Sequence, residues 1–169
     1  MKVQIRRSVF ETNSSSVHTI TMSKDCNSYK KNPIPEKLVF HTSCYGWEVE
    51  KYDTPNERAS YLYTALVNIS NETLEDDKRV ITDILAKHGC EAVFEEVPQN
   101  SWSDCYIDHG NELDEFIGVV MSGEDALMEY LFGDSCVYTY NDNMGYYDMR
   151  YSKEIDNLSD NYYKIRKGN

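Results

Sequence analysis

Long apolar runs are missing from the sequence, and its opening residues, MKVQIRRSVF, place basic side chains before no apolar core. A membrane-spanning helix needs about 20 largely apolar residues, and a signal peptide needs an apolar stretch of about 7–15. We therefore expect neither, and we expect a cytoplasmic protein. The 169 residues, of which 40% are hydrophobic and 27% charged, predict one folded domain rather than a disordered chain.

Paired cysteine motifs are missing, which excludes the common metal and redox motifs. The five cysteines include no C-x-x-C pair, and their odd number is typical of reduced thiols in a cytosol. Three short pairings of His with Cys occur, but no two of them share the spacing of a zinc finger. We therefore expect no metal site and no cofactor. The pairings are His41 with Cys44, His88 with Cys90, and Cys105 with His109.

Lysine and arginine are absent from residues 88–149, although the chain holds 17 of them elsewhere. The same stretch contains 14 acidic residues, so it accounts for all of the formal net charge of −12. A chain this acidic is not expected to bind DNA or an anionic membrane through its overall charge, although local basic sites stay open.

Such a concentration of one charge destabilises a fold through self-repulsion, and two interpretations are open. The acids form a solubilising surface, or they form a nucleic-acid-mimicking surface that docks on a basic site of another protein, where complementary charge speeds association. Tyrosines near the end of the stretch are frequent in protein interfaces, although strand propensity also explains them. The residues predicted to contact a partner are Glu91, Glu95, Glu96, Asp108, Glu112, Asp114, Glu115, Glu124, Asp125, Tyr138, Tyr140, Tyr146 and Tyr147.

The first half of the chain predicts strands followed by helices. Alternating apolar residues predict short strands around Val3–Ile5 and Ile20–Met22, joined by a polar connection. A loop containing two prolines then leads to a strand at 37–42. The tetrapeptide Thr54-Pro55-Asn56-Glu57 is typical of a capped helix start, and a second helix is predicted to end before Gly89.

The second half predicts alternating short elements. We expect a strand at 91–97, a helix at 111–121, a helix capped by Ser122 that ends at Gly133, and a Tyr-rich hairpin of 135–141 with 146–151. The fold class is therefore α+β, with a small mixed or antiparallel sheet, about four helices and a C-terminal Tyr-rich β-hairpin. We expect a single domain over 1–169, made of N-terminal strands (2–51), a helical hairpin (54–89), an acidic segment (90–151) and a polar tail (152–169).

The N-terminal connection, residues 6–18, is dense in polar side chains. Its arginines suit phosphate oxygens, its Asn and Ser backbone suits an anion, and Glu11 with His18 suits proton transfer. The set would serve phosphodiester cleavage or a nucleotidyl or ribosyl transfer. The alternative is a structural turn, in which His18, in phase with Ile20, is a hydrogen-bonded core residue. The candidate catalytic residues are Glu11 and His18, and the candidate ligand-binding residues are Arg6, Arg7, Asn13, Ser14, Ser15 and Ser16.

Read as R-x-x-x-F-E-T-N-S-S-S-x-H, residues 6–18 resemble a motif that opens many small uncharacterised proteins of Firmicute phages and mobile elements. The resemblance covers little more than residues 1–20, and the stretches 45–48 and 59–63 are also similar to that group. It implies a phage or mobile-element protein that acts inside a bacterial host cell, and it implies no particular chemistry.

Two functions follow from these features. Small acidic phage proteins are often inhibitors of host machinery, anti-CRISPR proteins among them. We therefore expect an anti-defence inhibitor that occupies the basic nucleic-acid-binding site of a bacterial immune effector nuclease. The alternative is a small nuclease or nucleotide-modifying enzyme built on the N-terminal motif, with RNA, for example a guide RNA, as its substrate.

Overall fold

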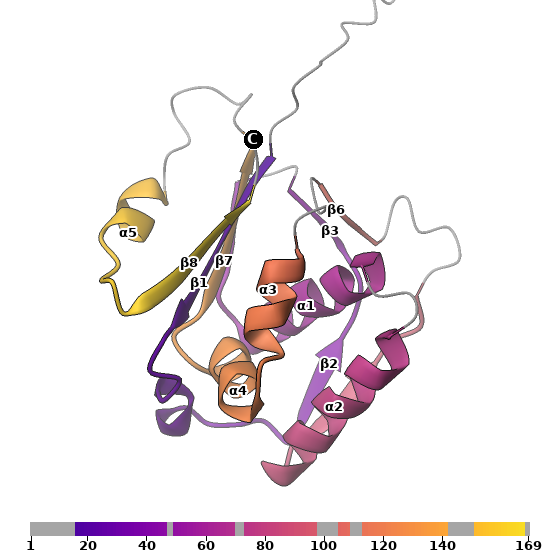
Figure 1. Ribbon diagram of the computed structural model, residues 1–169. Coiled ribbons are helices and arrows are strands. Elements are labelled where there is room, and N and C mark those ends of the chain that lie inside the picture. Colours follow the sequence, from indigo (N-terminus) through magenta and orange to yellow (C-terminus); the bar gives the residue numbers. More distant parts are fainter. Residues whose placement is uncertain are drawn as a thin grey trace, which may run out of the picture.

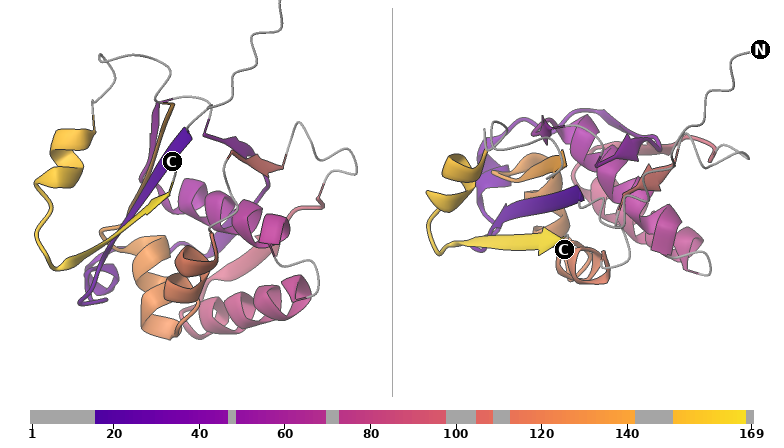
Figure 2. Two further views of the ribbon diagram at one scale, coloured as in Figure 1. Left: turned by 45° about the horizontal axis from the view of Figure 1, so that its top comes forward. Right: turned by 90° about the horizontal axis from the view of Figure 1, so that it is seen from above.

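The structure is a computed structural model that describes residues 16–46, 49–69, 73–97, 105–108, 113–141 and 151–167. Within these ranges helices and strands combine in the α+β class that the sequence predicts (Figure 1). A four-stranded sheet has most of the helices and two small two-stranded sheets on one of its sides (Figures 1 and 2). The strand predicted around Val3–Ile5 lies outside the described residues.

The four-stranded sheet is antiparallel and has the order β4-β7-β1-β8. Strand β1 (Ser16–Ser23) lies between β7 (Cys136–Asn141) and β8 (Tyr162–Lys167), and β4 (Glu50–Tyr52) pairs with the other side of β7. A strand from the start of the chain is therefore held between two strands from its end. This arrangement makes the fold depend on contacts between residues far apart in the sequence.

Alternation along the strands gives this sheet two different faces. On the inner face, Ile20 lies opposite Val137 in β7 and Ile165 in β8, and all three side chains are buried in the hydrophobic core. On the outer face, Thr21 lies opposite Cys136, and both line a cleft. The inner face packs against the helices of the core, whereas the outer face is covered from the C-terminal part of the chain.

Helix α1 (Pro55–Ile69) is the centre of the core, and it contacts β2 (Lys37–Phe40), α3 (Asp114–Val120) and α4 (Glu124–Phe132). Every residue from 58 to 66 is buried, because the helix is covered on all sides rather than along a single stripe. Aromatic rings link it to its neighbours. These include edge contacts that run from Tyr61 through Phe116 to Tyr130.

The remaining elements of the core side are helix α2 and two pairs of short strands. Helix α2 (Leu74–Lys87) packs against β5 (Glu91–Phe94), which is parallel to β2. A second parallel pair joins β3 (Cys44–Tyr45) to β6 (Tyr106–Ile107). No helix in the described ranges combines the length and the apolar character needed to cross a membrane.

Two small helical elements lie at the edges. The 3₁₀ turn η1 (Ser28–Lys31) contacts α4. Helix α5 (Ser152–Asp156) lies on the side of the four-stranded sheet away from α1 and α2 (Figures 1 and 2). The polar tail predicted for 152–169 therefore forms a short helix and then adds β8 to the sheet, a strand that the sequence pattern does not predict.

The predicted helix ends are confirmed at two positions. The Thr54 backbone N–H donates to Glu57 Oε2 at 3.0 Å, and the Glu57 N–H donates to Thr54 Oγ1 at 3.4 Å, which is the reciprocal pair of a capping box. Gly89 has φ of 74° just after α2, the left-handed conformation that glycine adopts most readily.

Two predictions need correction. Ser122 does not cap α4, because the N-cap position belongs to Gly123 and the Ser122 hydroxyl donates back to the carbonyl of Val119 at 2.7 Å. The prediction that β7 forms a hairpin with residues 146–151 is also wrong. The two sides of β7 are taken by β1 and β4, and Tyr151 precedes α5 instead of lying in a strand. Residues 142–150 lie outside the described part.

Candidate functional site

The N-terminal motif enters the described structure at its end. Arg6, Arg7, Glu11, and residues 13–15 lie outside the described residues, and Ser16 begins β1. His18 is on the inner face of β1, in phase with Ile20, and its side chain is only 1% exposed. The motif therefore runs directly into the central strand of the sheet.

His18 is packed tightly among core residues. Its Nδ1 atom lies 3.0 Å from the hydroxyl of Tyr61, with which it shares a hydrogen bond. Gly46, at φ of 107°, lies against its other side, where an added Cβ would be 2.7 Å from His18 Nε2 and 2.9 Å from Asp108 Cβ. A general acid or base must reach its substrate. This burial favours the structural interpretation of His18.

Most of the acids predicted to contact a partner are at the surface. They lie on β5 and the residues after it, at the start of α3, and at the start of α4. Glu124 is half-buried and pairs with Lys87 at 2.8 Å and with His88 at 2.9 Å. These hydrogen bonds lower the pKa of Glu124. We call the following set the acidic surface: Glu91, Glu95, Glu96, Asp114, Glu115, Glu124 and Asp125.

Burial removes two predicted contact residues from this surface. Asp108 is 5% exposed beside His18 and Gly46, and Tyr138 is 2% exposed on the outer face of β7. Both positions are covered because neighbouring segments fold over them, which a list of residue types does not reveal. Glu112, Tyr146 and Tyr147, and the side chain of Tyr140, lie outside the described part of the structure.

A cleft of about 350 Å³ opens on the outer face of the four-stranded sheet. Its lining comes from the sheet, the start of α1, the turn between α4 and β7, and the C-terminal segment around α5. The residues are Thr21, Lys51, Asp53, Arg58, Gly133, Asp134, Ser135, Cys136, Tyr138, Glu154, Leu158 and Tyr162. The volume lies within the range of small-molecule sites in proteins.

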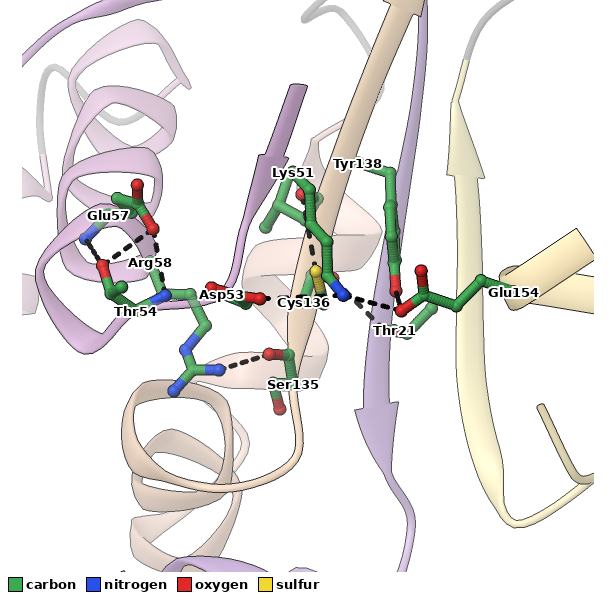
Figure 3. Close-up of polar contacts among 11 residues, drawn as sticks. Thr21, Lys51, Asp53, Thr54, Glu57, Arg58, Ser135, Cys136, Tyr138 and Glu154 are labelled. Carbon is green, nitrogen blue, oxygen red and sulfur yellow. Dashed lines mark hydrogen bonds and ion pairs between the residues drawn. The ribbon is translucent and has the colours of Figure 1, made fainter. Parts of the chain in front are cut away.

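Lys51, Tyr138 and Glu154 point toward one another at one end of this cleft (Figure 3). Lys51 Nζ lies 2.7 Å from Glu154 Oε1, and the Tyr138 hydroxyl donates to the same oxygen at 3.0 Å. Asp53 Oδ2 makes a longer contact with Lys51 Nζ, at 3.6 Å. The hydrogen bond to Glu154 raises the pKa of Lys51, and the same bond, together with that from Tyr138, lowers the pKa of Glu154.

Arg58 forms the opposite wall of the cleft (Figure 3) and is only 3% exposed. Its guanidinium donates to the backbone carbonyl of Leu131, in the last turn of α4, and to that of Ser135, in the turn after the helix. A cation at this position suits the partial negative charge at a helix C-terminus. Arg58 therefore joins α1 to the end of α4 and adds positive charge behind the cleft.

Cys136 lines the cleft but is not set up as a nucleophile. Burial is the largest of the causes that raise the pKa of its thiol to about 11. The reactive form of cysteine is the thiolate, which is a very small fraction at neutral pH when the pKa is this high. The charged groups and the hydroxyl of the cleft can hold a ligand through charge and hydrogen bonds.

No motif in the sequence indicates this cleft. Lys51 lies 103 residues before Glu154 in the sequence, and no spacing rule connects either of them with Tyr138. Comparison of the chain with protein-family models, curated proteins and solved structures gave no match.

Proposed function

We propose that this protein is an inhibitor that docks its acidic surface on the basic nucleic-acid-binding site of another protein. The proposed partner is an immune effector nuclease in the cytoplasm of a bacterial host, so that the protein acts as an anti-defence factor of a phage or mobile element. The inhibitor occupies the site by mimicking nucleic-acid charge, and it acts stoichiometrically because it blocks the site rather than changing it chemically.

The observation that carries the proposal is the placement of the acids in a stretch without any Lys or Arg. Glu95 and Glu96 follow β5 and are exposed, as are Asp114 and Glu115 in the first turn of α3. Among the ion pairs of the described residues, those that reach this set come from Lys87 and His88, at the end of α2, and both meet Glu124. Exposed charges of one sign attract a surface of the opposite sign over about 10 Å at moderate salt.

Charge complementarity acts mainly on the association rate and on orientation. An acidic protein that approaches a positively charged nucleic-acid channel is steered in the same way as the nucleic acid itself. The proposal therefore expects competition between this protein and nucleic acid, and it expects this competition to weaken as salt is added.

The test measures inhibition of a panel of bacterial immune effector nucleases, together with displacement of fluorescently labelled nucleic acid from each. For a nuclease that is inhibited, the Glu95→Lys/Glu96→Lys variant is expected to associate up to about tenfold more slowly than the unchanged protein. Raising the salt concentration is expected to slow association of the unchanged protein to a similar extent. The control is Asp156→Lys/Asp160→Lys, which makes the same change in net charge at exposed positions near α5. The control is expected to inhibit nearly as well as the unchanged protein.

Equal losses in the two variants would mean that net charge, not the acidic surface, controls association. Affinity that does not change with salt would contradict the mimicry. The enzyme alternative is separated by stoichiometry, because an enzyme inactivates many nuclease or RNA molecules per copy. Turnover that is lost in Glu11→Gln, with the fold intact, would replace the inhibitor with the small nuclease.

A further inference from the structure

The cleft on the outer face holds a carboxylate on two fixed hydrogen-bond donors. Glu154 accepts from Lys51 Nζ and from the hydroxyl of Tyr138, and the Lys51 ammonium lies 5.7 Å from the centre of the Tyr138 ring. Tyr138 is almost fully buried in β7, with its hydroxyl directed to the carboxylate, and Lys51 is on the neighbouring strand β4. The donors therefore belong to the interior and edge of the sheet.

The acceptor, Glu154, lies outside the sheet, in a segment that packs on its outer face. We call residues 151–161 the α5 segment. One ring contact joins it to the sheet, between Tyr151 and Tyr138 at 5.3 Å between centroids. Polar contacts add to it: Lys164 Nζ donates to the carbonyl of Leu158 at 2.7 Å, and Lys24 Nζ donates to that of Asp160 at 2.8 Å. Segments with few apolar contacts open at a lower free energy than a packed core. The carboxylate of Glu154 is thus the more easily displaced member of the cluster.

We propose that this cleft binds a small molecule carrying a phosphate or carboxylate group, and that Glu154 occupies the anion position until the ligand replaces it. Lysine is a common phosphate ligand because its ammonium acts as a point charge, and the hydroxyl of Tyr138 supplies a directed donor. The buried guanidinium of Arg58 adds positive charge to the wall of the cleft.

The neighbouring acids limit the affinity without preventing binding. Asp53 keeps its 3.6 Å contact with Lys51, and Asp134 lies on the turn before β7. Both are exposed to solvent, where water and salt screen their repulsion of an incoming anion. Removal of the Glu154 charge then leaves two cations and two acids around the cleft. This site is separate from the acidic surface, and the inference does not depend on the proposed inhibitor function.

The experiment follows backbone amide and tyrosine signals of the full chain by NMR during titration with ribose 5-phosphate, with gluconate and with ribose. At matched ionic strength, saturable shifts at residues 51, 136 and 138 are expected with an anionic probe and not with ribose. Phosphate is the ligand group if ribose 5-phosphate binds more tightly, and carboxylate is the group if gluconate does. The Glu154→Gln variant is expected to bind about two- to fivefold more tightly, the change in equilibrium constant that an exposed ion pair typically gives.

Matched variants distinguish replacement of Glu154 by the ligand from an effect of the net charge of the protein. Asp156→Asn removes the same charge from α5 outside the cleft, and it is expected to leave affinity unchanged. Tyr138→Phe keeps the buried ring but removes the donor, and it is expected to weaken binding, as is Lys51→Met. Equal shifts with ribose, an equal gain in Asp156→Asn, or unchanged binding in folded Tyr138→Phe and Lys51→Met would each overturn the proposal.

Discussion

The two faces of the four-stranded sheet are covered by different means. The inner face, around Ile20 and Val137, belongs to the buried apolar core and contacts α4, and His18 joins it to Tyr61 of α1. The outer face, around Thr21 and Tyr138, is covered by the α5 segment through an ion pair, hydrogen bonds and one ring contact between Tyr151 and Tyr138. Burial of apolar area supplies most of the free energy of folding, whereas half-exposed ion pairs contribute little. The inner face is therefore expected to contribute more to the stability of the fold than the covering of the outer face does.

The largest effect is expected on the inner side. Phe116 is fully buried and its ring contacts those of Tyr61 and Tyr130 edge-on, at 5.6 and 5.2 Å between centroids. Phe116→Ala leaves a cavity among these rings and is expected to lower the free energy of unfolding by about 3–5 kcal/mol. Urea denaturation measures it. A loss below about 1 kcal/mol would mean that α3 does not belong to the core.

A smaller but specific effect is expected where the backbone passes His18. Gly46→Ala places a Cβ against His18 Nε2 and Asp108, at a backbone φ of 107°, and is expected to destabilise by about 1–3 kcal/mol. Gly118→Ala is the control. An added Cβ there meets nothing within 4 Å in α3, and the change is expected to stabilise the helix by about 0.5–1 kcal/mol. Thermal denaturation of the two variants should therefore shift in opposite directions.

Arg58 connects the two sides of the comparison, because it lines the outer cleft but is bonded to the end of α4 in the core. Arg58→Met keeps most of the side-chain volume and removes the donors to Leu131 and Ser135. A buried carbonyl group that loses its hydrogen-bond partner costs about 1–3 kcal/mol when water cannot replace that partner. We expect a loss of about that size in urea denaturation, and a loss below about 0.5 kcal/mol would show that water replaces the guanidinium.

The sequence predicts the helices and strands better than it predicts which side chains meet on each face of the sheet. Local signals were sufficient for α1, because Thr54 and Glu57 meet within one turn, and for the end of α2 at Gly89. The role of β8 was missed, because its strand character depends on pairing with β1, more than 100 residues earlier. The cluster of Lys51, Tyr138 and Glu154 was missed for the same reason. Residue types indicate which groups are charged, but only the topology determines which of them meet.

The smallest effect is expected at the outer face, and it depends on pH. Hydrogen bonds from Lys51 and Tyr138 hold the pKa of Glu154 below its ordinary value. A carboxyl group whose pKa is lowered by folding stabilises the folded state above its unfolded pKa, and this contribution is lost as the pH falls through the lowered value. Attachment of the α5 segment is therefore expected to weaken below about pH 4, while the inner face stays packed.

Amide hydrogen exchange at pH 7 and pH 3.5 compares the two faces in one sample, after correction for the intrinsic rates. Protection of residues 152–156 is expected to fall at low pH, whereas protection of α1 is expected to change less. In Glu154→Gln the difference between the two pH values at α5 should largely disappear, because the side chain no longer titrates. If α5 and α1 lose protection together in the unchanged protein, the two faces open as one cooperative unit, and the contrast between them applies to their chemistry but not to their stability.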